Sequence, residues 1–310
     1  MARPSKMDLL IRYKDLIEKK LITYSKNKKI KIFREQNLKD ILEYIKKDIS
    51  IGRTTKFNEF SKFLVDSEIM IHITFKYDNG RKVIRYYISK DNISDYKLAL
   101  SLSKKSFISH YSAMDYHDLT DNIPKRIYIN VEQHHSSRGH SYLDEIPQEN
   151  IDRAFSKKMR KTNKIISENN RNIEIVFLNS ANTGYFGVIK ASYKDNLIKV
   201  TSLERTLVDI VVRPAYSGGG LEVLKAFKKA RDKEISVGKI ISILKKNDYI
   251  YPYEQCIGFL LEKANYEKKV IDRIYNICEN KRKFYLDYNI PEKSFSKKWN
   301  LYYPKFFDTL

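Results

Sequence analysis

The segment from Val200 to Val223, V-T-S-L-E-R-T-L-V-D-I-V-V-R-P-A-Y-S-G-G-G-L-E-V, constrains the fold more than any other part of the chain. Either Thr201 or Ser202 can accept a hydrogen bond from the first free N–H groups of a helix. With Thr201 as the cap, Glu204 completes a capping box. Apolar residues then recur at helical spacing, at Leu203, Leu207, Ile210 and Val211. Pro214 prevents much continuation because it lacks an N–H group. The segment predicts a capped core helix between a strand and a glycine-rich turn.

A surplus of basic residues indicates a polyanionic partner. The 310 residues include 59 Lys+Arg against 38 Asp+Glu, a net charge of +21, and 42% are hydrophobic, as in a globular chain of two or three domains. Residues 1–110 carry 25 basic and 13 acidic side chains, whereas residues 111–310 carry 34 and 25. Nucleic acid is the first candidate partner and an anionic membrane surface the second, with the N-terminal third as the contact surface.

Cysteine usage and hydropathy indicate the compartment. Cys256 and Cys278 are far apart and have no metal-ligand spacing, and no apolar stretch of signal-peptide type follows Met1 to Met7. No window approaches the roughly 18 apolar residues of a membrane-spanning helix. We therefore expect a cytoplasmic protein that does not enter the membrane.

The first third of the chain has the pattern of a small DNA-binding domain. Apolar periodicity predicts three helices, at residues 7–24, 36–48 and 57–67. Two alternating strands then flank Asn79-Gly80, the dipeptide typical of a type I′ hairpin turn with positive φ at both central residues. Three helices followed by a two-stranded ribbon is the order of a winged helix-turn-helix domain, which we place at residues 1–95. A small α+β domain without a DNA role is the alternative.

The basic residues of this domain cluster on two neighbouring predicted elements. A helix in the major groove and a basic wing on the adjacent backbone would use cations at these positions. The candidate DNA contacts are Arg53 and Lys56 at the start of the third helix, Lys62 on its outer face, and Lys76, Arg81, Lys82 and Arg85 on the hairpin.

The remainder, residues 96–310, reads as a larger mixed α/β domain with a helical C-terminal part, so that the whole chain is of the α+β class. Strands are expected at 126–131, 173–178, 184–191 and 197–201, and the pattern after Thr201 is almost entirely helical to about residue 280. The aromatic and basic tail from Phe284 to Leu310 is expected to pack back on this domain.

Several segments of the second domain resemble one protein family. The segment T-S-x-E-R-T-L-V-D-I…R-P-x-Y-x-G-G…E-V-L-x-A-F resembles the AbiEi family, the antitoxin half of bacterial two-gene abortive-infection modules. F-I-S-H-Y-S-A-M-D-Y-H-D-L-T, from Phe107, and Y-P-Y-E-Q-C-I-G-F-L-L-E, from Tyr251, are similar to further motifs of that family. The residues of these segments that match the family's motifs include Thr201, Glu204, Arg205, Asp209, Arg213, Tyr253 and Gln255.

The resemblance implies a two-part protein. Its winged helix-turn-helix would bind inverted repeats in its own promoter and repress the operon. Its C-terminal antitoxin domain would counteract a nucleotidyltransferase-type toxin, without an obligatory stable complex. No combination of nucleophile, base and orienting group is legible in the sequence, so we expect no enzymatic activity and no cofactor. The alternatives are a metal-dependent nuclease or a transferase that modifies the toxin, or a plain transcriptional regulator with a sensing domain.

Three constellations are candidates for chemistry, and each has a simpler structural interpretation that we favour. His134, His135 and His140 suggest a metal site, but a polar loop without Cys or carboxylate partners explains them. Gly218 to Gly220 could cradle a phosphate, but no P-loop pattern accompanies them and a helix-entry turn suffices. The cluster of Glu204, Arg205, Asp209 and Arg213 could form an active site, but Arg205 and Asp209 have the spacing of an intrahelical ion pair.

Overall fold

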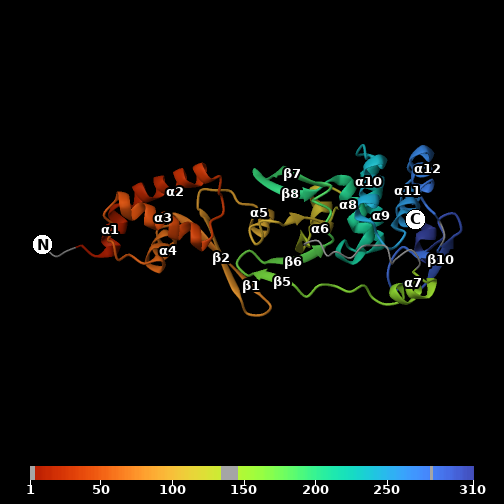
Figure 1. The fold of residues 1–310 in the computed structure, drawn as a ribbon, viewed down its shortest axis with the longest axis horizontal. Coiled ribbons are helices and arrows are strands. Elements are labelled where there is room, and N and C mark those ends of the chain that lie inside the picture. The colour runs from red at the N-terminus through yellow and green to blue at the C-terminus, as the bar shows by residue number, and fades with distance from the viewer. Residues whose placement is uncertain (1–3, 134–145, 280–281) are drawn as a thin grey trace. The chain divides into compact units, whose positions relative to one another are not determined.

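The computed structural model describes residues 4–133, 146–279 and 282–310, and it shows a mixed α/β protein (Figure 1). The chain forms two compact units. The first consists of Met1–Ser101 together with Ile166–Ile173 and Lys194–Asn196, and the second of Leu102–Ile165, Glu174–Tyr193 and Leu197–Leu310. Within the described residues, no helix is both long and apolar enough to cross a bilayer.

The first unit contains the helices expected from apolar periodicity. The first expected helix is divided at Tyr13, and the other two match the prediction within a residue. The elements are α1 (Lys6–Arg12), α2 (Lys14–Lys28), α3 (Glu35–Asp48), α4 (Phe57–Asp66), β1 (Met70–Tyr77), β2 (Lys82–Ile88) and α5 (Asp95–Leu100). One apolar cluster joins α1, α2, α3 and α4 to β1 and β2, because each of these helices buries an apolar stripe. Phe33, between α2 and α3, forms a β-bridge with Tyr86 of β2.

The hairpin of β1 and β2 is confirmed, but its turn differs from the prediction. Tyr77 and Arg81 are joined by a hydrogen bond from the Tyr77 N–H to the Arg81 carbonyl (2.9 Å), and the Gly80 N–H donates to the Tyr77 carbonyl (2.9 Å). Only Gly80 has a positive φ, +80°, and Asn79 does not. The loop is therefore a three-residue turn closed by a left-handed glycine, and the type I′ prediction was wrong.

The hairpin also has a third strand that its sequence does not indicate. The strand β5 (Ile165–Glu168) pairs antiparallel with β1, with Lys76 opposite Ser167 and Tyr77 opposite Ile166. An isolated two-stranded hairpin is marginally stable in water, so the added strand stabilises the end of the ribbon that lies beyond the helices.

In the second unit, strands run in the order β6-β4-β3-β8-β7. Their bounds are β3 (Phe107–Ile108), β4 (Arg126–Glu132), β6 (Ile173–Ser180), β7 (Val188–Tyr193) and β8 (Asn196–Thr201). The pairs β4–β6 and β3–β8 are parallel. All four strand segments expected in this domain are present, but the one expected at 184–191 begins only at Val188.

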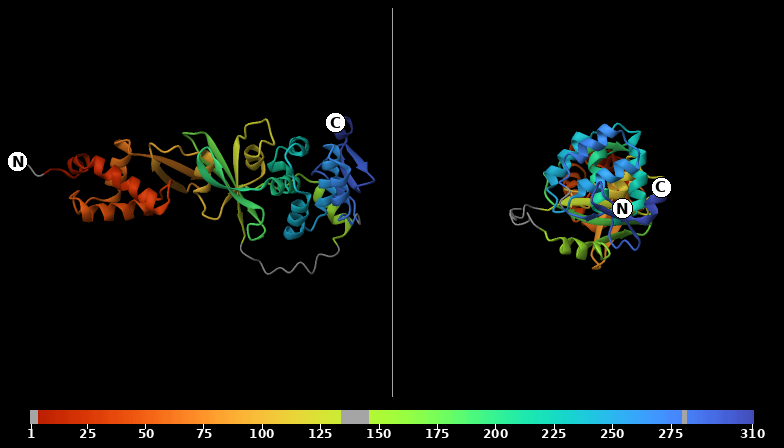
Figure 2. Two further views of the ribbon diagram at one scale, coloured as in Figure 1. Left: turned by 90° about the horizontal axis from the view of Figure 1, so that it is seen from above. Right: turned by 90° about the vertical axis from the view of Figure 1, so that its right-hand side faces the viewer.

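The helical part after Thr201 is confirmed, and Figure 2 shows its later helices gathered beside one another. The helices of this unit are α6 (His110–Tyr116), α7 (Gln148–Phe155), α8 (Leu203–Val212), α9 (Gly220–Arg231), α10 (Val237–Asn247), α11 (Tyr253–Lys263) and α12 (Lys268–Tyr275), with the 3-10 turn η2 at Pro214–Tyr216. A small sheet of β9 (Phe284–Tyr285), β10 (Lys293–Ser296) and β11 (Leu301–Pro304), with the 3-10 turn η3 (Lys305–Thr309), ends the chain.

Helix α8 is the centre of this unit, because it is buried on every side rather than on one stripe. Its cap is Ser202, whose Oγ accepts from the Arg205 N–H at 3.2 Å. Thr201 is the last residue of β8, so the capping box with Glu204 does not form. The Thr201 carbonyl lies 2.7 Å from His117 Nε2, and the next residue, Ser202, caps the helix.

The aromatic tail packs back on the second unit, as expected. Trp299 is fully buried, and its Nε1 donates to Glu262 of α11. Its ring lies directly against Gly258 of α11, at a place that a Cβ on that residue would occupy. The glycine of the Y-P-Y-E-Q-C-I-G-F segment is therefore required by packing.

We expect Gly258→Ala to destabilise the protein by about 3 kcal/mol, because the buried indole cannot move aside and overpacking outweighs the gain in helix propensity. Gly238→Ala in α10 is the matched control: its nearest neighbour is the flexible end of Arg273, at 3.3 Å, so it should be neutral or slightly stabilising. Urea unfolding followed by fluorescence of the single tryptophan measures both. Equal stability of the two variants would contradict the packing explanation.

Candidate functional site

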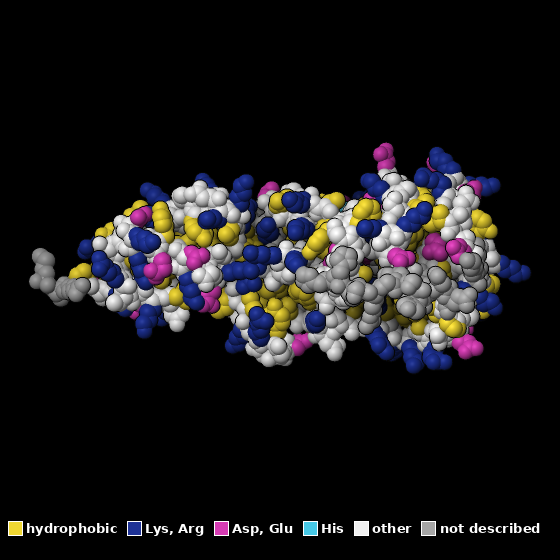
Figure 3. Space-filling model, in the orientation of Figure 1, with side chains coloured by type: hydrophobic (Ala, Val, Ile, Leu, Met, Phe, Trp, Pro, Cys, Tyr) yellow, Lys and Arg dark blue, Asp and Glu magenta, His cyan; other side chains and the backbone are white. Residues whose placement is uncertain are grey.

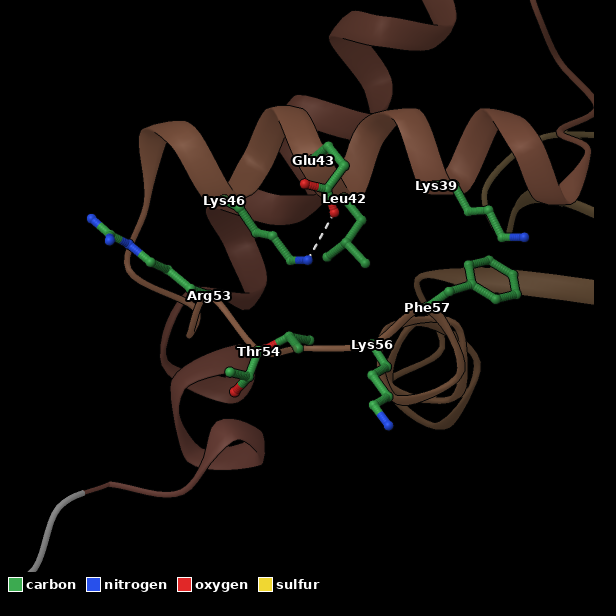
Figure 4. Close-up of a pocket in the computed structure, with 9 residues that line it drawn as sticks. Lys39, Leu42, Glu43, Lys46, Arg53, Thr54, Lys56 and Phe57 are labelled. Carbon is green, nitrogen blue, oxygen red and sulfur yellow. Dashed lines mark hydrogen bonds and ion pairs between the residues drawn. The ribbon is translucent and has the colours of Figure 1, made fainter.

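The first unit has an exposed basic region around the turn between α3 and α4. A hollow of about 420 Å³ lies there, and Figure 4 shows the side chains that border it. Arg53 comes from the turn, Lys56 immediately precedes α4, and Lys39 and Lys46 project from α3. The Lys56 N–H donates to Glu59 Oε2 at 2.6 Å, which fixes the first turn of α4. The local hydrogen bonds thus place cations at a helix N-terminus.

The three cations predicted on the turn and on α4 are exposed. Arg53, Lys56 and Lys62 form no side-chain hydrogen bond or ion pair with the described residues. On α4 the buried face carries Phe60, Phe63 and Leu64, so Lys62 lies on the opposite, outer face. The arrangement leaves their charges available to an external anion.

Three of the four hairpin cations are also exposed. Lys76 and Lys82 are opposite each other at the end of the ribbon, and Arg81 follows the turn with its guanidinium 5.6 Å from the centre of the Tyr77 ring. Figure 3 shows that Lys and Arg side chains recur over one face of this unit, with acidic side chains among them.

Arg85 is the exception, and its interpretation as a hairpin DNA contact is corrected. It is 8% exposed, and its guanidinium donates to the Ser101 carbonyl at 3.2 Å and to the Ile84 carbonyl at 2.8 Å. Burial lowers its pKa. Ser101 ends α5, where a carbonyl lacks a helical partner, so Arg85 caps that helix rather than facing solvent.

Sequence reasoning missed several basic residues on α2 and α3. Lys39 and Lys46 lie seven residues apart on the outer face of α3, and a second hollow of about 490 Å³ is bordered by Lys19, Lys20 and Lys28 of α2. These lysines recur at helical spacing on the faces opposite the apolar stripes, and this pattern could have identified them from the sequence. Lys39 forms an ion pair with Glu35, and Lys46 forms one with Glu43. These acidic partners weaken the attraction of the two lysines for an anionic ligand.

In the second unit, the motif residues Arg205 and Asp209 form the expected ion pair. Arg205 Nε donates to Asp209 Oδ1 at 2.7 Å, and Arg205 Nη1 donates to the Phe186 carbonyl at 2.8 Å. The side chains are 2% and 7% exposed. Gly187, with φ of +75°, lies against the aliphatic part of Arg205, where a Cβ would come within 2.9 Å. The pair is part of the core.

The other motif residues divide into two groups. Arg213 and Tyr253 border the same cavity as Arg205 and Asp209. Three others lie elsewhere: Thr201 is bonded to Thr206 (2.8 Å), Glu204 accepts from the Ser236 N–H (3.3 Å), and Gln255 donates to the Arg282 carbonyl (3.1 Å). An active-site cluster of Glu204 with Arg205, Asp209 and Arg213 is therefore not assembled.

The glycine-rich turn before α9 is a helix-entry turn. Gly219 is the N-cap, with φ of +88°, and the Gly220 N–H donates to Asp287 Oδ2 at 3.1 Å. Because the protein's own carboxylate occupies this helix N-terminus, the phosphate-cradle interpretation does not hold there.

The cavity bordered by the motif residues has a volume of about 650 Å³. It lies at the carboxyl ends of the parallel strands β4 and β6, which contribute Asn130 and the segment 178–181. His110, at the start of α6, borders it as well, and burial lowers the pKa of this imidazole to about 4. Burial, followed by the Asp209 charge, raises the pKa of Tyr249. Both side chains are therefore neutral near pH 7.

Metal binding finds no support in the described part of the chain, where no group of three or more His, Cys, Asp or Glu side chains is placed to hold an ion. The histidines of the metal hypothesis, His134, His135 and His140, lie outside the described residues.

The buried His110 predicts a loss of stability on acidification. Its pKa is lower in the folded state (about 4) than the ordinary value of 6.5, so unfolding takes up a proton between these values. Stability then rises with pH, and this residue contributes a loss of about 2 kcal/mol between pH of about 7.5 and about 5. His117 acts in the same direction and Glu254, whose pKa burial raises to about 7, in the opposite one.

Comparison with His110→Gln isolates this contribution, because both other groups, and the Asp209, Arg205 and Arg213 charges that face His110, are common to the two proteins. The unfolding free energy of the unchanged protein should fall faster on acidification than that of the variant. Parallel curves from urea titrations would show that the imidazole is not buried in its neutral form.

Comparison with known proteins gives a fold neighbour and no family. No protein-family model matches the chain, and no curated protein matches it. Among solved structures, the chain is similar to the RV2827C protein from Mycobacterium tuberculosis, with a TM-score of 0.52 and 12% identity over 93% of this chain and 91% of that one. At this identity the likeness shows the fold alone.

Proposed function

We propose that this chain is a DNA-binding antitoxin of the AbiEi type, which binds inverted repeats in its own promoter and counteracts a nucleotidyltransferase-type toxin. The observation that carries the DNA-binding part is the placement of free cations on two adjacent elements of the first unit. Arg53, Lys56 and Lys62 are exposed at α4, and Lys76, Arg81 and Lys82 on the neighbouring hairpin. The antitoxin part depends on the resemblance of the second unit's motifs.

The order of elements supports a winged helix in the first unit. A helix, a bridging residue at Phe33, two helices joined by a turn, and a hairpin follow one another, and Phe33 pairs with the hairpin at Tyr86. In such a domain α4 would enter the major groove, and Lys62, on its outer face, would point toward the DNA. The hairpin cations would contact the phosphates beside it.

In the proposed antitoxin domain, the buried motif residues of the second unit hold the fold together. Arg205 and Asp209 hold α8 inside the unit, and Tyr253 and Gln255 anchor α11. Buried residues of this kind preserve a fold rather than contact a partner. We therefore place the toxin-directed surface outside these residues.

The experiment that tests the proposal has two readouts on the full chain. Binding to a duplex of the promoter should exceed binding to a shuffled duplex and should weaken steeply with salt. Coexpression with the toxin encoded beside it should restore growth. Promoter binding without rescue would favour a plain regulator. Turnover of nucleic acid or modification of the toxin would favour an enzyme, and absence of both promoter binding and rescue would reject the proposal.

A further inference from the structure

The cavity of the second unit has the position of a ligand site. It lies outside the carboxyl ends of the parallel strands β4 and β6, where open α/β sheets bind ligands in the crevice between loops. Helix α8, the segment 160–162 and the segment 247–251 form its other sides. A volume of about 650 Å³ suits a small organic molecule.

Three residues that border this cavity each have a buried polar atom without a hydrogen-bond partner in the described part of the chain. Asp209 Oδ2, Asn130 Oδ1 and Ser180 Oγ are buried and have no hydrogen bond within the described residues. Asp209 and Asn130 are only 5% and 3% exposed. A buried polar group without a partner lowers stability, so such groups at one cavity indicate an absent donor. Two of the atoms are acceptors, which favours a ligand that offers N–H or O–H groups.

The mouth of the cavity is cationic. Arg213 is exposed and its guanidinium has no hydrogen-bond or ion-pair partner in the described part of the chain, and Arg160 and Lys161 are two further exposed residues of the lining. Of the two acidic residues that border the cavity, Asp248 is exposed and Asp209 is paired with Arg205. An anionic group, and a phosphate above all, is the matching chemistry, because arginine binds it in a bidentate manner.

The walls are aromatic. Tyr216, Tyr249, Tyr251, Tyr253 and Tyr288 border the cavity, and Tyr249 and Tyr251 are only partly buried. Tyr249 and Tyr251 each pack edge-on against Tyr253, with ring centres 5.3 Å and 6.1 Å apart. Tyr251 also stacks on Phe284, with ring centres 5.7 Å apart, so the partly buried ring of Tyr249 is the one that a planar group can pack against. An acyl chain has no donors for the unpartnered polar atoms of Asp209 and Asn130. A neutral sugar has no negative charge to pair with Arg213, Arg160 and Lys161.

We propose that this cavity binds a nucleotide-sized organic phosphate. The phosphate lies at Arg213 with Arg160 and Lys161, the planar ring lies among the tyrosines, and its N–H or O–H groups donate to Asp209 and Asn130. The site lies in the second unit, and the inference does not depend on DNA binding or on antitoxin activity.

The test is calorimetric titration of the full chain with the four common nucleoside monophosphates, with the matching nucleosides and inorganic phosphate as separate probes. At least one nucleotide should bind in the micromolar range, and its nucleoside and inorganic phosphate at least about 10-fold more weakly. No binding by any nucleotide, or equally tight binding of the nucleoside or of inorganic phosphate, would overturn the proposal.

Two variants locate the site without altering the core. Arg213→Gln removes the exposed guanidinium, and Ala181→Glu places a carboxylate at the exposed lining residue 181. Each should weaken the nucleotide at least about 10-fold. Lys245→Gln is the control for non-specific attraction by a basic protein, since Lys245 is exposed on α10 outside the cavity lining, and it should leave affinity unchanged. Tryptophan fluorescence verifies the fold, and equal weakening in all three variants would overturn the assignment.

Discussion

The full chain with glutamate at positions 53, 56, 81 and 82 is expected to bind its promoter at least about 100-fold more weakly than the unchanged protein. The four cations Arg53, Lys56, Arg81 and Lys82 are exposed, the first two in the turn before α4 and the others at the hairpin, and the proposal assigns each a phosphate contact. Loss of four contacts should also make the slope of log affinity against log salt less negative by about 4. Fluorescence anisotropy over a salt series measures both, and repression should be lost while rescue from the toxin persists.

The matched control makes the same change of charge elsewhere. Four exposed lysines of the second unit are replaced by glutamate, namely Lys245, Lys246, Lys268 and Lys297. This variant should retain most of its affinity, because net charge alone acts weakly over a Debye length. Equal loss in the two quadruple variants would place DNA binding outside the first unit. If the first-unit variant folded but lost rescue, the proposal that the first unit binds DNA and the second counteracts the toxin would be rejected.

Arg205→Met is expected to have the largest effect on stability, a loss of about 3–5 kcal/mol. The variant leaves the Asp209 carboxylate buried without its cation and leaves the Phe186 carbonyl without its donor. The double variant Arg205→Met/Asp209→Leu removes the unpaired charge and should recover most of the loss. Urea unfolding of both proteins measures the difference.

Lys39→Met is the control for this experiment. Lys39 and Glu35 have the same i,i+4 spacing and the same 2.7 Å distance as Arg205 and Asp209, but their side chains are 47% and 55% exposed. Exposed pairs contribute at most about 1 kcal/mol, so this substitution should cost little. Arg205→Met could lower the free energy of unfolding no more than Lys39→Met does, or the double variant could be no more stable than Arg205→Met. Either result would show that burial does not determine how much the Arg205–Asp209 pair contributes to stability.

Features that depend on neighbours in sequence were predictable. The helices over α3 and α4 followed from apolar residues three and four positions apart, and the hairpin from alternation on both sides of Asn79-Gly80. The Arg205–Asp209 pair followed from its spacing in one helix. These interactions join residues at most a few positions apart, so the chain's own periodicity specifies them.

Features that depend on distant partners were not predictable. Arg85 was expected to contact DNA from the hairpin, but it is buried because its guanidinium donates to the Ser101 carbonyl at the end of α5. The N-terminus of α9 is filled by Asp287, 67 positions from Gly220 along the chain. No local pattern encodes any of these partners.

The sequence by itself determined the helices α3 and α4, the hairpin, the pairing of Arg205 with Asp209 and the basic character of the first third, because periodicity, spacing and charge are local properties. Only the tertiary structure decided which cations stay free and which cap a helix, that Trp299 packs on Gly258, and that Asp209, Asn130 and Arg213 border one cavity. The physical reason is that burial and hydrogen-bond satisfaction depend on segments far apart in the chain, and folding alone brings those segments together.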